Sequence, residues 1–168
     1  MKGSRARTGR AASAVLAAGV LAAVLTACGA SASSREASAE RQSAANLAGL
    51  IDQLHEDLAV TELEGDSLAA ARRALRSYPD QVAALVAFDD FGSCRTMVRN
   101  AGSAVGRLHA VAATLASACR LLERAAELFT VAQTSGDAQV LLRASERALA
   151  ATPLLYRARV QLAAARRA

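Results

Sequence analysis

A heptad stripe of apolar residues runs through the middle of the chain and constrains its fold more than any other feature. Between residues 94 and 129 the spacing alternates between four and three: Cys94, Val98, Ala101, Val105, Leu108, Ala112, Leu115, Cys119, Leu122, Ala126 and Phe129. Such a stripe is typical of helices that pack along their whole length against other helices, as in a left-handed bundle. Gly102 and Gly106 interrupt it, and each glycine costs about 1 kcal/mol inside a helix. We therefore expect either one long helix or two helices joined by a turn.

The segment before this stripe shows the same helical periodicity. Between residues 35 and 63 the apolar positions fall on one helix face: Leu47, Leu50, Ile51, Leu54 and Leu58. Gly65 is expected to end this helix, and Asp66 or Ser67 to cap the next one. Because proline removes a hydrogen-bond donor and clashes with the preceding turn, we expect a kink or break at Tyr78-Pro79.

The C-terminal segment carries two columns of small and apolar residues after the turn-like residues 134–137. One column is Leu141, Ala148, Leu155 and Leu162, and the other is Ala144, Ala151, Ala158 and Ala165. Thr152-Pro153 is expected to kink this helix, or to start a new one with Thr152 as its cap. No segment alternates convincingly with period two. We therefore predict an all-α fold, in which residues 35–168 form a single domain, an antiparallel bundle of about four helices.

Residues 1–27 have the organisation of a secretory signal peptide. Four basic residues precede an uncharged run, residues 11–27, that is rich in alanine, valine and leucine. The run ends in Leu25-Thr26-Ala27-Cys28, which is a branched apolar residue and two small residues before a cysteine. This motif resembles the lipobox of bacterial lipoproteins. The resemblance covers only the leader, and it implies that residues 1–27 are removed and that Cys28 becomes a lipid-modified N-terminus.

Residues 28–34 are small and mostly polar, and we expect them to form a flexible tether between the lipid and the domain. Lasting anchorage needs more than one acyl chain, which the diacylglycerol implied by the resemblance supplies. The protein is then expected at the extracytoplasmic face of the cell membrane. Two alternatives stay open. Ala30-Ser31-Ala32 is a site for an ordinary signal peptidase, whose cut would release a secreted protein, and the apolar run could also remain as an uncleaved anchor.

The net charge of +5 belongs mainly to the leader. Removing its four basic residues leaves sixteen basic against fifteen acidic residues, so the charge gives no reason to expect nucleic-acid binding. Residues 35–66 hold eight acids and two arginines, and the rest of the mature chain is basic. We interpret this as an acidic first helix that packs beside basic helices. The alternative is a basic surface for anionic lipid headgroups, built from Arg157, Arg159, Arg166 and Arg167.

Cys94 and Cys119 are the two cysteines left to the mature domain once Cys28 is lipidated. An oxidising compartment favours a disulfide between them. In one continuous helix they would lie about 37 Å apart, whereas a disulfide needs Cα atoms about 4.4 to 6.8 Å apart. A disulfide therefore requires the chain to fold back within residues 100–106. The alternatives are two reduced thiols packed in the core, or thiol chemistry at the surface.

The remaining polar residues form no recognisable catalytic, metal or cofactor motif. His55 lies in a single Asp-x-x-His and begins an incomplete His-Glu-x-x-His, and His109 flanks the heptad stripe, so we expect both histidines to be solvated or partly packed. Glu123 and Glu127 are one helical turn apart among arginines, which indicates surface ion pairs. Phosphate-binding loops, dinucleotide fingerprints and nucleophile elbows are missing from the sequence.

We therefore expect a non-catalytic envelope lipoprotein that acts as an interaction or structural module. Its expected partners are the membrane, through the N-terminal lipid, and other envelope proteins, with no nucleic acid, cofactor or metal. The alternative is a binding protein for a small apolar or lipid-like ligand held between helices, and an enzyme is a third class. A ligand binder should contain a continuous apolar cavity, whereas an interaction module should fill its core and expose a groove or patch.

Overall fold

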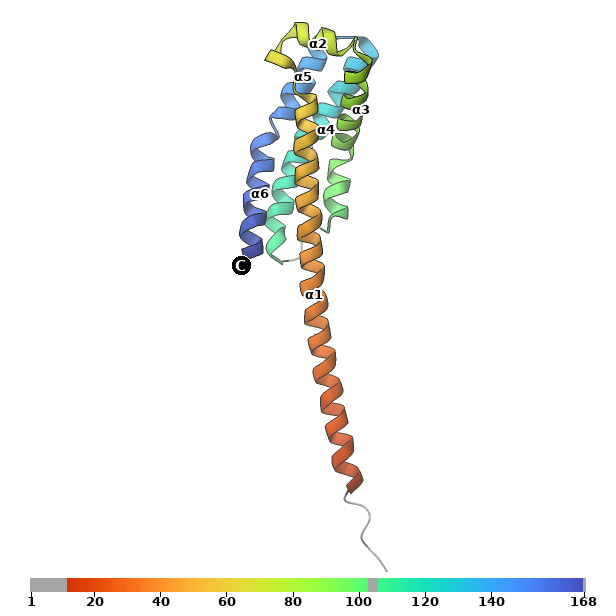
Figure 1. Cartoon of the computed structure of the whole chain (residues 1–168), viewed down its shortest axis with the longest axis vertical. Helices are drawn as coiled ribbons and strands as arrows, with labels where there is room; N and C mark the ends of the chain where they lie inside the picture. Colours follow the sequence, from red (N-terminus) through yellow and green to blue (C-terminus); the bar gives the residue numbers. More distant parts are fainter. Residues whose placement is uncertain (1–11, 103–105, 168) are drawn as a thin grey trace, which may run out of the picture. The chain divides into compact units, whose positions relative to one another are not determined.

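The predicted heptad stripe forms two antiparallel helices and not one. In the computed structural model, residues 12–102 and 106–167 are described, with side chains from residue 34 onward except those of residues 66 and 78–80. These residues form α-helices and short 3-10 turns, without a strand, which confirms the all-α bundle (Figure 1). The chain divides after Arg41 into two compact units.

The first unit is helical from residue 12 to residue 41 and forms the beginning of α1 (Ala12–Thr61). This helix includes residues 28–34, the expected tether, but the side chains of residues 12–33, Cys28 among them, lie outside the described residues. Residues 1–11 of the leader lie outside them entirely. Cleavage, the lipid and the tether therefore stay predictions. Within the described residues, no helix combines the length and hydropathy that a bilayer crossing requires.

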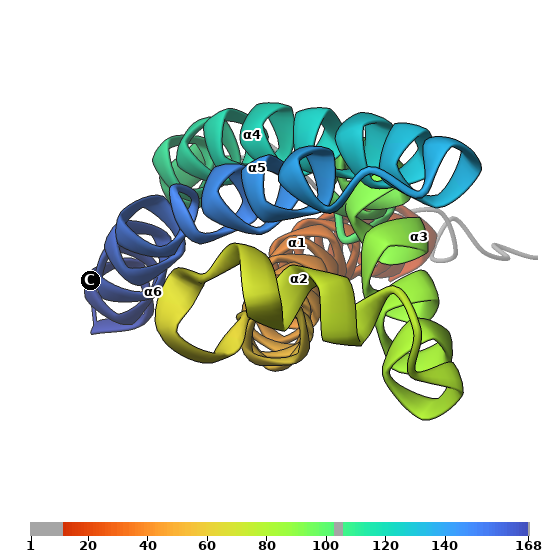
Figure 2. The ribbon, with the colours of Figure 1, turned by 90° about the horizontal axis from the view of Figure 1, so that it is seen from above.

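The second unit begins at Gln42 and contains the helical bundle. Its elements after α1 are η1 (Glu64–Asp66), α2 (Leu68–Ala74), α3 (Tyr78–Asn100), η2 (Gly106–Leu108), α4 (His109–Ser135), α5 (Ala138–Leu149) and α6 (Thr152–Arg167). Residues 42–61 of α1, then α3, α4 and the α5–α6 pair run alternately up and down, and α2 lies across one end (Figures 1 and 2). α4 contacts α3, α5 and α6.

Polar contacts tie α1 to its neighbours on both sides. Gln53 Nε2 donates to Asp90 Oδ2 of α3 at 2.7 Å, and Arg159 of α6 forms an ion pair with Asp52. The buried Ser145 hydroxyl of α5 donates to the Thr61 carbonyl at 2.7 Å. The second unit is therefore one helical bundle, formed by α1 from residue 42 onward, α3, α4 and the α5–α6 pair, as the sequence predicts.

Helix ends follow the expected signals with one exception. Gly65 adopts a φ of 68°, and the Ser67 hydroxyl accepts from the Ala70 N–H, so Ser67 is the cap of α2. The break near Pro79 is complete, because α2 ends at Ala74 and a new helix starts at Tyr78. At the start of α6 the expected cap is wrong. Thr152 is already helical, and the Ala151 carbonyl accepts from the Leu155 N–H at 3.1 Å.

The core consists of the predicted apolar columns. Every described member of the 94–129 stripe is buried except Ala126, which is half-buried, and Val105 lies outside the described residues. The five predicted positions of α1 are buried, as are both C-terminal columns apart from the half-buried Ala165. Alanine is common among the buried residues of α4, α5 and α6, which contact one another, and small side chains allow close approach of helix backbones. The residues fully shielded there include Ala118, Ala125, Ala132, Ala144, Ala148, Ala151 and Ala158.

A disulfide joins Cys94 of α3 to Cys119 of α4, with the Cα atoms 5.3 Å apart. The chain folds back after Asn100, and Gly102 has a φ of 86°, which glycine adopts without strain. The turn therefore lies where the sequence required it. Both cysteines are fully buried, which removes them as surface thiols.

A candidate binding groove between helices α3 and α4

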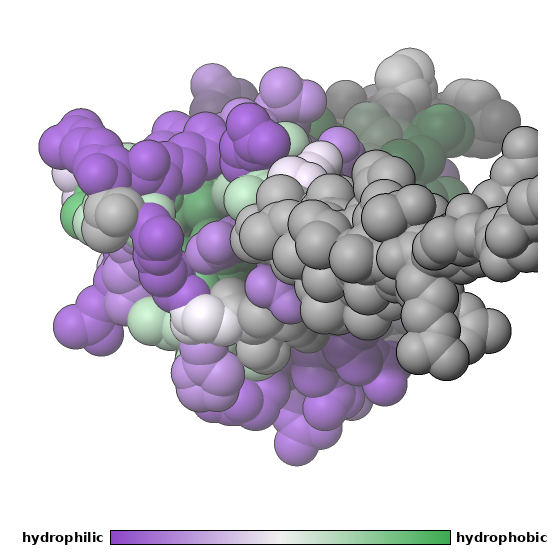
Figure 3. Space-filling view, turned by 90° about the horizontal axis from the view of Figure 1, so that it is seen from below, coloured by the Kyte–Doolittle hydropathy of each residue, from purple (hydrophilic) through white to green (hydrophobic). Residues whose placement is uncertain are grey.

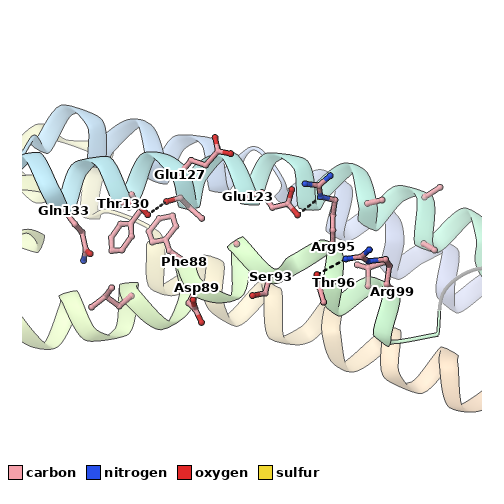
Figure 4. A pocket seen from close by; sticks show the side chains of 18 of the residues that line it. Phe88, Asp89, Ser93, Arg95, Thr96, Arg99, Glu123, Glu127, Thr130 and Gln133 are labelled. Atoms are coloured by element: carbon pink, nitrogen blue, oxygen red, sulfur yellow. Dashed lines mark hydrogen bonds and ion pairs between the residues drawn. The ribbon is translucent and has the colours of Figure 1, made fainter.

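An open groove of about 1070 Å³ runs along the outer side of α3 and α4. On α3 its lining extends from Leu85 to Arg99, and on α4 from His109 to Gln133 (Figure 4). Small residues line much of its length: Gly92, Ser93, Ala112, Ala113, Ala116 and Ala126. A Cβ atom at Gly92 would lie 3.9 Å from the Ala126 Cβ, so the two helices come close together here. The two walls of the groove are therefore close together at Gly92 and Ala126, and the groove is open to solvent along its length.

One end of the groove combines a pair of stacked aromatic rings with the polar residues Asp89, Thr130 and Gln133. The rings of Phe88 and Phe129 stack with their centroids 4.1 Å apart and an angle of 15° between their planes. Phe88 also packs edge-on against Phe91, at 5.4 Å. Leu85 lies at the mouth beside this stack and is 46% exposed, with the exposed Val86 next to it in the chain. This end therefore offers an apolar side chain a place to bind.

The other end is polar and mainly basic. Arg95 Nε donates to Glu123 Oε1 at 2.6 Å and joins the two helices across the groove (Figure 4). This hydrogen bond and the charge of the carboxylate raise the pKa of Arg95 above its usual value. Arg99 donates to the Thr96 hydroxyl at 3.0 Å, and the exposed His109 closes this end. The charged side chains at this end can therefore form ion pairs or hydrogen bonds with polar groups of a bound molecule.

A second, smaller pocket of about 290 Å³ lies beneath α2. Its lining is mixed: apolar residues such as Val60, Leu63, Leu75, Ala84 and Leu141 lie beside the polar Glu62, Glu64, Arg73 and Gln81. It shares Phe88, Phe129 and Gln133 with the groove. The stacked rings thus stand between the two hollows.

The residues singled out in the sequence are spread over the bundle. His55 Nδ1 lies 2.8 Å from the Ile51 carbonyl, so it bonds to its own helix, whereas His109 lines the groove. Glu127 forms an ion pair with Arg124 of its own helix, as expected, whereas Glu123 pairs with Arg95 of α3. In the part of the chain with described side chains, no three His, Cys, Asp or Glu residues gather in a way that would hold a metal ion.

Asp57 is an unusual residue that the sequence analysis does not single out. Burial, and then the charges of Asp90 and Glu56, raise its pKa from 3.8 to about 6. Its Oδ2 atom is buried and has no hydrogen-bond partner among the described residues. A signal in the sequence is its helical spacing, because Asp57 follows the buried Leu54 by three residues and precedes the buried Thr61 by four. This carboxyl group lies outside the groove and weakens the fold when it is ionised.

Neither a protein-family model, a curated protein nor a solved structure matches this chain at a significant level. Its function must therefore be inferred from the groove, the charge distribution and the N-terminal sequence.

Proposed function

We propose that this protein is a non-catalytic lipoprotein of the cell envelope, held at the outer face of the cytoplasmic membrane by a lipid on Cys28, and that its bundle binds another envelope protein. The observation that carries the proposal is the groove between α3 and α4. Buried side chains form one continuous core through the bundle, and the hollow between α3 and α4 opens to solvent. A filled core with an accessible groove favours an interaction module over a carrier of small molecules.

The groove suits an amphipathic helix of the partner. From Leu85 to Arg99 it follows about 21 Å of α3, which matches roughly four turns of helix. The small residues at Gly92 and Ala126 permit close approach, as in helix-in-groove recognition. A large apolar residue of the partner would bind near Leu85, and an acidic residue would lie opposite Arg99 and His109. The partner is thus an exported protein with a helix of this pattern.

The smaller pocket supports a second candidate function. Its apolar residues beneath α2 suit the apolar part of a small lipid-like ligand, and Arg73 and Gln81 suit its polar group. Its volume of about 290 Å³ lies just below the range of ligand pockets, which begins at about 300 Å³. The two candidates differ in their sensitivity to substitution. A bulky residue at Gly92 obstructs the groove and leaves this pocket unchanged.

The anchor is tested by mass spectrometry of protein extracted from membranes. We expect the N-terminal peptide to begin at Cys28 and to carry a diacylglycerol, and Cys28→Ala to lose both the processing and the lipid. A native chain that begins at Ser33, or one that keeps residues 1–27, would refute the proposed location.

The groove is tested with a photo-crosslinking amino acid placed at Thr96 in the intact protein in cells. We expect cross-links to a helical segment of an exported protein, identified by sequencing the cross-linked peptide. The same probe at the exposed Val160 of α6 is the matched control and should not give this product. Gly92→Leu should abolish it. A product that persists in Gly92→Leu, or a cross-linked peptide without an amphipathic helical pattern, contradicts the proposed binding mode.

A further inference from the structure

Two long stretches of the second unit contain no acidic residue. Neither Asp nor Glu occurs in residues 91–122 or 147–168, and none occurs in residues 42–51 of α1. The first two stretches hold Arg95, Arg99, Arg107, Arg120, Arg147, Arg157, Arg159, Arg166 and Arg167. In the folded domain they form the C-terminal half of α3, the turn after it, the first half of α4, and all of α6. Charge is therefore segregated along the bundle.

These stretches meet where α1 enters the second unit, at what we call the basal end. Arg166 of α6 donates to the Ala44 carbonyl at 2.8 Å. A Cβ atom at Gly102, in the turn after α3, would collide with the Ser43 side chain. The last turn of α6 and the α3–α4 turn thus both lie beside Ser43 and Ala44. Figure 3 views this end, and hydrophilic residues cover much of its coloured surface.

Three basal arginines are not neutralised by the fold. Arg99, Arg166 and Arg167 are exposed, and none of them forms an ion pair with the described residues. Further from this end, Arg95 and Arg159 are paired with Glu123 and Asp52. The basal end therefore carries a positive charge that the domain leaves available to an outside anion.

Helix dipoles account for only part of this arrangement. Arg99 lies in the last turn of α3, and Arg166 and Arg167 lie in the last turn of α6, where cations are favoured. Each of the two helix C-termini carries a charge of about −0.5. The N-terminus of α4 lies at the same end and carries about +0.5, which cancels one of them. The positive charge of the three arginines is therefore larger than the negative charge of these helix ends.

We propose that the basal end binds anionic phospholipid headgroups of the membrane in which Cys28 is anchored. The inference rests on the proposed lipid anchor. Ser43 follows Cys28 by 15 residues, which span about 22 Å as a helix and on average about 21 Å as a flexible chain. Residues 28–41 contain two arginines and two glutamates and add no net charge. The anchor thus keeps the basal end near the headgroups, so individually weak contacts act at high effective concentration.

The test uses the full lipidated protein reconstituted into vesicles of phosphatidylcholine, with or without phosphatidylglycerol. The chain has no tryptophan, so Ala164→Trp on the exposed surface near the end of α6 provides a single reporter. Energy transfer from it to a dansyl-labelled lipid headgroup measures proximity to the bilayer. We expect stronger transfer with phosphatidylglycerol, and loss of that increase in high salt because screening shortens the reach of surface charge.

The decisive variant is Arg99→Gln/Arg167→Gln, which leaves the Arg166 bond to Ala44 intact. Each arginine near an anionic surface shifts the equilibrium roughly fivefold, so the double variant should lower the ratio of bound to detached domain about 30-fold. Arg72→Gln/Arg143→Gln, on exposed arginines of α2 and α5, removes the same charge and should change nothing.

The outcomes separate this inference from the proposed function. Protein without a lipid on Cys28 refutes both. Lipidated protein that shows equal transfer in the two kinds of vesicle refutes the headgroup contact and leaves the anchor standing. The contact is also refuted if the basal and control variants lose transfer equally, or if the basal variant loses it equally in neutral vesicles.

Discussion

Reduction of the bond between Cys94 and Cys119 should markedly destabilise the bundle. The bond closes a loop with a sequence separation of 25 residues. For a loop of that length, the chain-entropy estimate gives about 3.5 kcal/mol of stabilisation at 25 °C. Native domains have only about 5 to 15 kcal/mol of stability, so the reduced protein should be marginal.

Urea unfolding followed by circular dichroism, on the full chain in detergent, measures this loss. We expect the midpoint to fall by about 2 M on reduction, for an m-value between about 1 and 2 kcal/mol per M. Cys94→Ala/Cys119→Ala should lose at least as much, because removing two buried sulfurs also leaves small voids. Intact mass after alkylation, with and without reduction, verifies that two thiols are released. If oxidised and reduced protein unfold at the same urea concentration, the assigned stabilisation is wrong.

Three further changes test the packing of the bundle by urea unfolding. Because the pKa of Asp57 is raised in the folded state, its ionisation lowers the free energy of unfolding as the pH rises from about 4 through about 6. Asp57→Asn should therefore raise that free energy by about 1 kcal/mol at pH 8, after allowance for solvent screening, and leave it unchanged at pH 4. A gain of the same size at both pH values would contradict this. Gly102→Ala should cost about 2 kcal/mol, because alanine is strained at φ 86° and its Cβ meets α1, whereas Gly49→Ala, in open space on α1, should gain about 0.5 to 1 kcal/mol. Equal effects would show that the turn is not constrained. Ser145→Ala should cost about 1 kcal/mol or more, since it leaves the Thr61 carbonyl unpaired, and a neutral result would argue against that bond.

The helices and their core faces could be predicted because burial leaves a period in the sequence. Leu47 to Leu58, the 94–129 stripe and the two C-terminal columns all repeat at helical spacing and are buried. The return of the chain near Gly102 followed from the distance that a disulfide permits. The new helix at Thr152-Pro153 is confirmed, but its cap is not Thr152, because the Ala151 carbonyl is the first acceptor and an alanine carries no cap signal in its side chain.

The groove could not be predicted in the same way. A heptad pattern reports which side of a helix faces the core, whereas the groove is lined mainly by flanking positions, where Gly92 and Ser93 look like ordinary surface residues. Four members of the stripe also line it, namely Val98, Ala112, Ala126 and Phe129, and the pattern alone predicts only their core contacts. The close approach of α3 and α4 depends on packing between residues far apart in the chain. The raised pKa of Asp57 has the same origin, because Asp90 comes near it only in the folded bundle.

The stacked rings of Phe88 and Phe129 form a partition with a different hollow on each side. An occupant of the groove that displaced either ring would reshape the hollow beneath α2, whereas one that left the rings in place would not. Displacement of the rings would couple binding on the two sides, and linkage would require each event to alter the affinity of the other by the same factor. A lipid-like molecule bound beneath α2 would in that case change the affinity of the groove for the helix of a partner protein. The candidate ligand would then regulate the other binding event.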